Sequence, residues 1–475
     1  MPCTTLLVGK LASADGSTLI ARNSDSGAGA YTPKKFVAVP PEDQPRTYTS
    51  VISGVTIALP EDPMPYTCVP NALKNEGEWA SAGINAANVG MTATETITSN
   101  PRVLGADPLV KNGIGEEDLV TLVLPYVKTA REGCLRLGSL LEEYGTYEMN
   151  GIGFSDEDDV WWLETIGGHH WMARRLPQDA YAVIPNQLGL DFFDFADPEN
   201  FIGSEDLEAF VKHNALDLRM DPEEPFNPRD AFGSHDDSDH TYNTPRAWWA
   251  LSRLNPDSFA WTGPDADFTP ESNDLPWCLV PEKKITVEDV KYVLSGHYQQ
   301  TPYDPYLHHG DTSMAGAYRT IGINRTDYLA CCQIKTGAPS IQWLAYASNP
   351  FNVMVPFYTD IIATPAYAAD TTDSVSTGSF YWTSRLIAAM ADACDRQSAI
   401  FIERYQNTTT ARCREILNRS TPEIQAASGK DRIHLCMEAN EQIAEVTREQ
   451  AQKCLGEVLK ALSDNMKNAF SRSDA

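Results

Sequence analysis

The sequence predicts a fold of mixed α and β structure, in the α+β class, with strands at the amino end and helices at the carboxyl end. Two short β-prone runs, residues 4–10 and 17–23, open the chain and flank an Asp-Gly pair of the kind found in chain reversals. Apolar residues recur at helical spacing over 116–143, and helical patterns return from residue 380 onward. These three observations together favour separate strand-rich and helix-rich regions.

The two β-prone runs are expected to pair as an antiparallel hairpin, with Gly16 supplying the positive φ that the reversal needs. A longer loop would place Cys3 opposite Asp25, whereas a tight two-residue turn would place Ala28 there. The sequence leaves both registers open. In the first register, strict alternation turns Arg22 to the other face of the sheet from Asp25 unless a bulge intervenes.

Short strands and loops are predicted over residues 29–75, and a strand with a turn over 78–97. The end of that second segment is rich in small and hydroxyl residues, which suits a pocket wall and equally a strand packed in a core. The helical region over 116–143 is interrupted by Pro125 and Gly133, which predicts two helices.

Long loops rich in Asp, Pro, Asn and His are predicted over 197–275, with one short helix over 207–214. Loops of this length on a rigid scaffold often carry substrate sites. Two further strands are expected between residues 318 and 346. Because 475 residues exceed what one core usually holds, we expect a large domain over 1–379 and a helical extension over 380–475 packed on it.

The charge balance disfavours several classes of partner. The chain carries 65 acidic against 37 basic residues, a formal net charge of −28, so nucleic-acid backbones and anionic membranes are not expected partners. No run of apolar residues approaches the ~18–20 that a membrane-spanning helix needs, and no secretory signal pattern opens the chain. We therefore expect a cytoplasmic protein, and whether it forms a homo-oligomer is left open.

The ten cysteines are scattered without C-x-x-C spacing, and most are expected to be buried thiols. Three doublets resemble parts of zinc sites: His169-His170, His308-His309 and Cys331-Cys332. Adjacent side chains on a strand point to opposite faces, so such doublets chelate poorly, and no metal site is predicted.

Cys3 is the candidate nucleophile because of what precedes it. Pro2 has no backbone N–H, so little strand can form upstream, and removal of Met1 and Pro2 would make Cys3 the amino terminus. Its α-amine, with an ordinary pKa of about 7.7–8.0, could then accept the thiol proton. A nearby Arg22 would favour the thiolate. A papain-like cysteine with a distant histidine is the alternative, but it usually sits in a different local signature.

Several segments resemble the cysteine-type dipeptidase family of N-terminal nucleophile hydrolases, the dipeptidase A-like family that is related to the secernins. The matching segments are CTTLLVGK and DGSTLIARNSD at the amino end, NVGMTATETI at Asn88–Ile97, VIPNQLGLDFFDF around Asn186, NTPRAWW around Arg246 and IQWLAYASNPFNVMVPFYTDI at Ile341–Ile361. The resemblance implies a four-layer αββα fold, with a helical carboxyl-terminal extension.

The resemblance also implies roles for individual residues. Cys3 would be the nucleophile, Arg22 would lie near its thiol, and Asp25 would orient the new amine. Asn186 matches the asparagine that binds the amine or the oxyanion in N-terminal cysteine hydrolases, a role that suits an amide donor. Arg246 is matched more loosely.

One position departs from the related amidases. Where those proteins carry an asparagine, this chain has Thr94-Glu95, so the second oxyanion donor is not identified and Glu95, with Thr94, becomes a candidate for binding a substrate amine.

The sequence thus predicts a cytoplasmic cysteine dipeptidase that hydrolyses dipeptides through a thioester on Cys3, without a metal or organic cofactor. One alternative is an amidase of acylated amino acids on the same fold, which would need an apolar slot in place of a carboxylate. A second alternative is a catalytically silent, secernin-like binding protein. Sequencing of the mature amino terminus separates the silent protein from the enzyme.

Overall fold

The computed structural model describes residues 3–234 and 236–466, and only the backbone of residues 93–95. Two large sheets form the centre of the molecule, and neighbouring strands in both run antiparallel. The seven-stranded sheet has the order β14 (Cys278–Leu279), β12 (Tyr181–Ile184), β1 (Cys3–Val8), β2 (Thr18–Asp25), β15 (Thr326–Ile334), β16 (Ile341–Tyr346) and β17 (Val355–Tyr358).

The second large sheet has eight strands. Their order is β13 (Phe201–Gly203), β11 (Trp171–Arg175), β10 (Val160–Thr165), β9 (Asn150–Ser155), β8 (Gly90–Thr96), β7 (Ala82–Asn85), β6 (Tyr66–Cys68) and β3 (Val37–Val39). A small separate sheet pairs β4 (Thr47–Thr49) with β5 (Thr56–Ala58).

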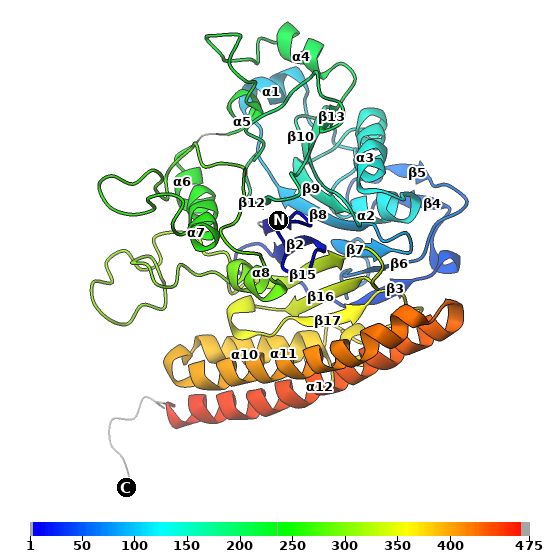
Figure 1. Cartoon of the computed structure of the whole chain (residues 1–475), viewed down its shortest axis with the longest axis vertical. Coiled ribbons are helices and arrows are strands. Elements are labelled where there is room, and N and C mark those ends of the chain that lie inside the picture. The colour runs from blue at the N-terminus through cyan, green and yellow to red at the C-terminus, as the bar shows by residue number, and fades with distance from the viewer. Residues whose placement is uncertain (1–2, 235, 467–475) are drawn as a thin grey trace.

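The helices lie outside the two large sheets (Figure 1). In chain order they are α1 (Pro101–Ala106), α2 (Leu119–Val123), α3 (Ala130–Tyr144), α4 (Leu207–His213), α5 (Pro228–Phe232), α6 (Asp239–Tyr242), α7 (Thr244–Leu254), α8 (Val287–Leu294), α9 (Ala366–Ala369), α10 (Phe380–Asp392), α11 (Asp395–Ala426) and α12 (Gly429–Asp464). Short 3-10 turns occur at Pro41–Asp43, Leu124–Tyr126 and Asn349–Phe351.

The two large sheets pack face to face. A Cβ added at Gly90 of β8 would lie 3.1 Å from the Cβ of Cys332 on β15, and one at Gly153 of β9 would lie 3.1 Å from Leu7 on β1. One apolar cluster joins the inward faces, and it includes Leu7 and Ile20 from one sheet with Trp162 from the other. Glycine at these positions therefore lets the sheets approach closely.

Helices cover the outer face of each sheet. Residues of α2 and α3 share a cluster with Met91, Phe154 and Trp161 of the eight-stranded sheet. Residues of α7, α8 and α10–α12 share another with Leu6, Val8 and Trp343 of the seven-stranded sheet. Alternate residues of β1 thus enter two different cores, which explains why this strand is apolar on both faces.

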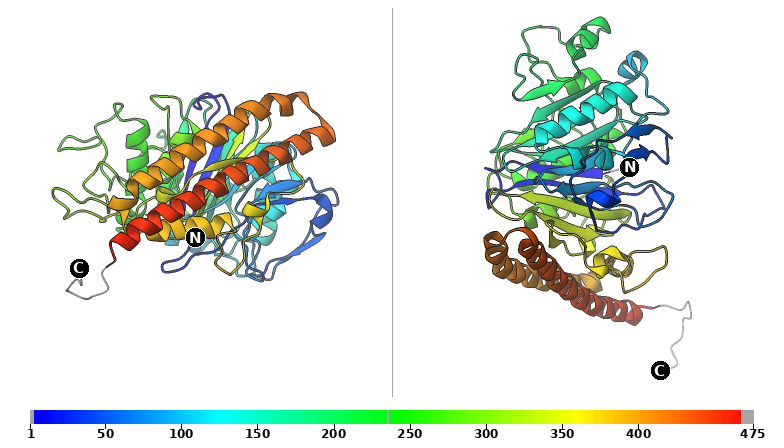
Figure 2. Two further views of the ribbon diagram at one scale, coloured as in Figure 1. Left: turned by 90° about the horizontal axis from the view of Figure 1, so that it is seen from below. Right: turned by 90° about the vertical axis from the view of Figure 1, so that its right-hand side faces the viewer.

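The long helices α11 and α12 lie side by side across the carboxyl-terminal end of the molecule (Figure 2). One face of α12 is buried at Ile443, Cys454 and Val458. In the described part of the chain, no helix is long and apolar enough to cross a membrane.

Some predicted boundaries were wrong. The helical region does divide at Pro125, but Gly133 lies inside α3, where a Cβ would lie 2.4 Å from the ring of Phe154. Gly133 therefore permits a close helix-to-sheet contact and does not end a helix. Residues 197–275 hold α5, α6 and α7 in addition to the predicted α4.

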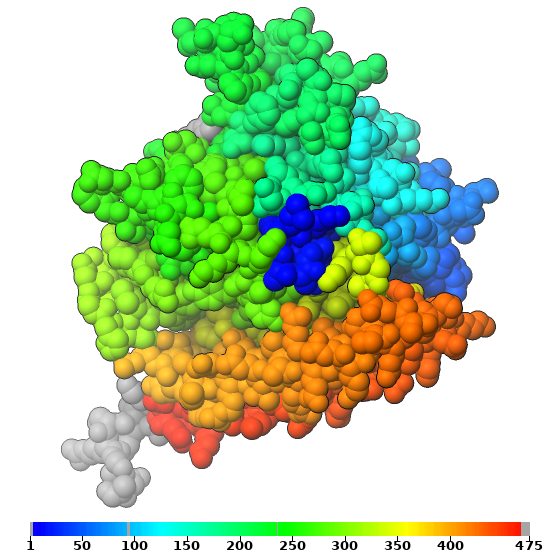
Figure 3. Space-filling view, viewed as in Figure 1, coloured from blue at the N-terminus to red at the C-terminus, as the bar shows by residue number. Residues whose placement is uncertain are grey.

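The hairpin of β1 and β2 runs through the middle of the seven-stranded sheet, and both strands are buried along their whole length. Only its connection is exposed, at Leu11 and at residues 14–16. This part of the chain forms the dark blue patch at the centre of the face shown in Figure 3. Cys3, at the other end of the hairpin, is buried.

Candidate active site

The hairpin register places Ser24, and not Asp25, opposite Cys3. The predicted register was wrong by one residue, and the alternative that paired Cys3 with Ala28 was wrong as well. Gly16 does adopt the expected positive φ, at +80°. The connection between the strands is held by contacts outside the hairpin, including Leu11 N to the carbonyl of Gln178 at 2.7 Å, and these contacts set its length.

Cys3, Ser24 and Arg22 project from the same face of the sheet, because Ser24 pairs with Cys3 and Arg22 lies two residues before Ser24. Arg22 Nη2 donates to Cys3 Sγ at 2.8 Å and to Glu116 Oε1 at 2.7 Å. The side chains of Arg22 and Glu116 are fully buried. The predicted proximity of Arg22 to the thiol is therefore present in the structure.

Glu116 was not predicted as a site residue. It lies just before α2, in a Gly-Glu-Glu-Asp stretch that reads as the polar start of a helix. The only signal in the sequence is the run of acids itself, and all three of its members are buried.

Charge interactions shift the ionisation of this pair. Burial lowers the pKa of Arg22, but the negative charges of Cys3, Tyr328 and Glu116 outweigh it and raise that pKa well above its ordinary value. Burial raises the pKa of Glu116, and nearby positive charge, including that of Arg22, brings it below the ordinary value. Both groups are therefore charged at neutral pH.

The backbone of Cys3 is held by a second pair of residues. Its N–H donates to Asn186 Oδ1 at 3.1 Å, and Asn186 Nδ2 donates to the carbonyl of Thr96 at 2.9 Å. Arg246 Nη1 donates to the carbonyl of Cys3, and Arg246 Nη2 donates to Asn186 Oδ1 at 2.8 Å. Asn186 comes from the end of β12 and Arg246 from α7, so the tertiary fold brings both to Cys3.

The guanidinium of Arg246 uses every N–H that it has. Besides Cys3 and Asn186, it donates to Thr4 Oγ1 at 2.7 Å, Asn243 Oδ1 at 2.8 Å and the carbonyl of Tyr242 at 2.7 Å. Such a fully bonded arginine fixes the position of the strand end.

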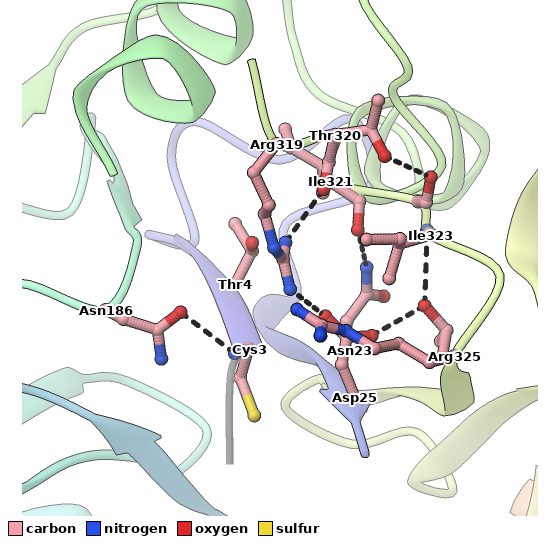
Figure 4. A network of polar contacts seen from close by, with 12 residues as sticks. Cys3, Thr4, Asn23, Asp25, Asn186, Arg319, Thr320, Ile321, Ile323 and Arg325 are labelled. Atoms are coloured by element: carbon pink, nitrogen blue, oxygen red, sulfur yellow. Dashed lines mark hydrogen bonds and ion pairs between the residues drawn. The ribbon is translucent and has the colours of Figure 1, made fainter. Parts of the chain in front are cut away.

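Asp25 lies on the face of the sheet opposite the thiol, as alternation requires. Its carboxylate accepts from Arg319 Nη2 and from Thr326 Oγ1, the latter at 2.6 Å. Figure 4 shows Asn186 on one side of Cys3 and the pair of Asp25 and Arg319 on the other. A bulge does occur here, but in β15 beside Asp25, between Thr326 and Tyr328.

The two candidates for binding a substrate amine fall outside the described side chains. The backbone of Thr94 and Glu95 lies in β8, with Glu95 paired to Gly151 of β9. The next residue, Thr96, is the one whose carbonyl contacts Asn186. Thr94 and Glu95 therefore directly precede, in the sequence, a residue that contacts the Asn186 side chain beside Cys3.

Three histidines of the doublets considered for zinc contact aspartates. His169 and His170 both contact Asp107, with ring nitrogens at 3.0 and 2.8 Å, because they lie in the turn between β10 and β11 and not within a strand. His308 contacts Asp395 at 2.5 Å. Among the residues that the structure describes, no group of three or more His, Cys, Asp or Glu side chains could hold a metal ion.

A cavity of about 690 Å³ opens beside Asn186. Thr96, Asp239 and Tyr242 contribute to its wall. Asp239 Oδ2 accepts from Ser234 Oγ at 3.0 Å, and its other oxygen accepts from Asn243 Nδ2. Because Asn186 both lines the cavity and accepts from Cys3 N, the cavity leads to the amino end of the hairpin.

Comparison with known proteins decides the family. The sequence profile of Peptidase family C69 matches residues 2–408. The chain belongs to peptidase family C69. This C69 chain is similar to a dipeptidase of Bifidobacterium longum, with 50% identity over the full length of both chains, and to a probable dipeptidase A of Streptococcus pyogenes serotype M3, with 52% identity over the full length of both.

A dipeptidase A of Lactobacillus helveticus is 42% identical to the C69 chain over 96% of each sequence. The profile match begins at residue 2 and includes the hairpin, Asn186 and Arg246. The C69 chain is therefore a peptidase, a hydrolase of peptide bonds, and the predicted family is confirmed.

Proposed function

We propose that the protein is a cysteine dipeptidase in which Cys3, once freed of Met1 and Pro2, is the nucleophile. The single observation that carries the proposal is the contact of Arg22 Nη2 with Cys3 Sγ at 2.8 Å, inside a buried pair with Glu116. A buried cation beside a thiol favours the thiolate. The relatives at 42–52% identity that are named dipeptidases support dipeptides as the substrates.

The α-amine of Cys3 acts as the general base in this mechanism. It takes the thiol proton, and the thiolate attacks the scissile carbonyl carbon to give a tetrahedral oxyanion. Collapse of that species breaks the C–N bond, and the ammonium returns its proton to the leaving amine. The product is a thioester on Cys3. The amine then deprotonates a water molecule, which attacks the thioester, releases the carboxylic acid and regenerates the thiol.

The residues around Cys3 take positioning roles. Asn186 accepts from the nitrogen of Cys3, so it would orient the lone pair of the free amine. Its amide N–H₂ is also a candidate oxyanion donor. Arg246 fixes the carbonyl of Cys3 and the carboxamide of Asn186. Asp25 holds the end of β2 through Arg319, and Thr94 with Glu95 remain candidates for contact with substrate.

We also propose that the two facing sheets and their helices are the four-layer αββα arrangement of N-terminal nucleophile hydrolases. Helix packing on both outer faces supports this assignment. Residues 1–379 would be the catalytic domain and 380–475 its helical extension, which shares the core of the seven-stranded sheet. A cytoplasmic location remains a prediction from the sequence.

Intact-mass measurement of the purified protein tests the central step. We expect the wild-type protein to lack Met1 and Pro2 and to incorporate one iodoacetamide adduct at Cys3, with loss of dipeptide hydrolysis. Cys3→Ala and Cys3→Ser should fold, as shown by unchanged circular dichroism, and should not hydrolyse dipeptides. Full activity in Cys3→Ala, or in protein that retains Pro2, would overturn the mechanism, because an amide nitrogen is not a base.

Cys3→Ala also reports on how maturation occurs. If the Cys3 thiol cleaves the preceding bond itself, the variant keeps Pro2, whereas trimming by other peptidases removes Pro2 from both proteins. Cys331→Ala is a matched control, since Cys331 is a fully buried cysteine of the same sheet that contacts the outer core. That variant should mature and react as the wild type does.

A further inference from the structure

The positions of the nitrogen and the sulfur of Cys3 define the direction in which a dipeptide binds. Under the proposed function, the α-amine must protonate the leaving nitrogen, so the leaving residue lies on the side of the Cys3 nitrogen. Asn186 and the 690 Å³ cavity lie on that side. The acyl residue becomes bonded to sulfur and lies on the side of Sγ, where Arg22 and Glu116 are found. In a dipeptide, the acyl residue is the one that carries the free α-ammonium.

Glu148 lies beside Glu116 on the sulfur side. Its Oε1 accepts from the backbone N–H of Glu116 at 2.7 Å, and it lies between α3 and β9, two residues before Asn150. Unlike Glu116, its side chain is only partly buried, so solvent and ligands can reach it. Glu148 thus contacts Glu116, and Glu116 in turn contacts the Arg22 nitrogen that donates to Cys3 Sγ.

Among the residues that the structure describes, none forms an ion pair with the Glu148 carboxylate, and the nearby cation Arg22 is already paired with Glu116. Glu148 lies next to Glu116, whose backbone N–H donates to its carboxylate at 2.7 Å, so the two acids are close neighbours. Burial, and then the charge of Glu116, raise the pKa of Glu148 to about 7. A cation bound at this carboxylate would restore its charged form and gain a favourable interaction.

A buried polar side chain lies beside Glu148. Asn150 is 1% exposed, and its Nδ2 donates to the carbonyl of Glu148 at 3.4 Å. Its Oδ1 is buried and has no hydrogen-bond partner among the residues that the structure describes. Asn150 also pairs with Thr96, whose carbonyl contacts Asn186, so it lies between Glu148 and the Cys3 environment. An ammonium group offers three N–H donors to such acceptors.

We propose that Glu148, assisted by Asn150, binds the free α-ammonium of the amino-terminal residue of the dipeptide. This inference rests on the proposed function and names a specificity-determining residue for it. The acids on the other side of Asn186 are less suited, because both carboxylate oxygens of Asp239 already accept hydrogen bonds from Ser234 and Asn243. Asp239 also borders the cavity on the nitrogen side, where the leaving residue lies.

The test compares two ligands that differ only in the amine. Alanyl-alanine carries the α-ammonium, and propionyl-alanine lacks it. Each compound is assayed with mature wild-type enzyme and with mature Glu148→Gln enzyme. Propionyl-alanine is tested both as a substrate and as a competitive inhibitor of alanyl-alanine hydrolysis. We expect Glu148→Gln to lower kcat/KM for alanyl-alanine by about 10- to 100-fold, mainly through KM, and to leave the Ki of propionyl-alanine unchanged.

Matched variants make the result specific. Glu148→Asp keeps the charge and should keep most of the preference for the amine, which also covers the case in which Glu148→Gln folds poorly. Glu143→Gln removes an exposed carboxylate near the end of α3 and should change neither ligand's kinetics. Asp239→Asn tests the competing acid.

Equal losses for both ligands in Glu148→Gln, or an unchanged KM for alanyl-alanine, would overturn the inference. Loss of the amine preference in Asp239→Asn and not in Glu148→Gln would do the same and would assign the ammonium to the cavity. Failure of the proposed function itself is distinguishable, since it would show as wild-type activity in Cys3→Ala.

Discussion

The carboxylate of Glu116 and the guanidinium of Arg22 form an ion pair at 2.7 Å in which neither side chain is exposed to solvent. The nitrogen that contacts Glu116, Nη2, is the one that also donates to Cys3 Sγ. The acid therefore sets both the orientation of the cation and the net charge that the sulfur experiences.

Replacement of Glu116 by Gln should make the Cys3 thiol react at lower pH. The variant removes a negative charge near sulfur and leaves the charge of Arg22 uncompensated, so the thiolate forms more readily. We expect the pH profile of iodoacetamide alkylation of the mature enzyme to move down by about one pH unit. Arg22→Gln should move it in the opposite direction. An unchanged profile in Glu116→Gln would show that this acid has no influence on the thiol.

Asn186 should matter more for turnover than for binding. Asn186→Asp keeps an oxygen to accept from the Cys3 nitrogen and Arg246, but it loses the N–H₂ group that donates to Thr96 and could reach the oxyanion. We expect kcat to fall by about 10²- to 10³-fold with a small change in KM, measured by steady-state kinetics. A change confined to KM would contradict the positioning role.

The contact between Asp25 and Arg319 should stabilise the fold. Removal of one member of a buried ion pair costs about 3–5 kcal/mol, because the other charge stays buried without its partner. Asp25→Asn should therefore lower the free energy of unfolding in urea more than the double variant Asp25→Asn with Arg319→Met does. Additive losses in the double variant would show that the two residues are not coupled.

Glu164 should make stability depend on pH. It is fully buried, and burial raises its pKa to about 7 although Trp162 and the backbone of Gly189 donate to it. Because the pKa of Glu164 is higher in the folded protein than in the unfolded protein, its contribution to the free energy of unfolding is complete below about pH 4.5. That contribution is lost as the pH rises through 7.

Relative to Glu164→Gln, the wild-type protein should therefore lose on the order of 3 kcal/mol of unfolding free energy between pH 4 and pH 8. Urea titrations of both proteins across this pH range measure the difference between their free energies of unfolding. The contributions of the other titrating groups cancel in that difference. A difference that is constant with pH would contradict the assignment.

The sequence was sufficient to predict the hairpin and the positive φ of Gly16, because these depend on local turn chemistry. The proximity of Arg22 to Cys3 was predicted through the family resemblance, and alternation accounts for it only in the observed register, where Ser24 pairs with Cys3. The sequence was not sufficient for the register. The connection of the hairpin is shaped by Gln178 and by the bridge between Ser13 and Ile285, which are remote in the chain. A one-residue difference of this kind has no local signature.

Glu116 and Glu148 were missed for a related reason. Glu116 lies 94 residues from Arg22 in sequence, and an acid before a helix ordinarily reads as a favourable interaction with the helix dipole. Only the packing of the two sheets brings these acids to Cys3. Asn186 and Arg246 were identified through the family resemblance, and the contacts with Cys3 now give each a physical reason.

The complete burial of Cys3 in a chain that still carries Met1 and Pro2 has a consequence for the timing of activity. Under the proposed function, the newly translated chain is a zymogen, since its nucleophile is covered and its base is still an amide. Hydrolysis would then begin only after a lag set by the speed of one cleavage. Control of that single step would therefore set when dipeptide hydrolysis begins, without any separate inhibitor.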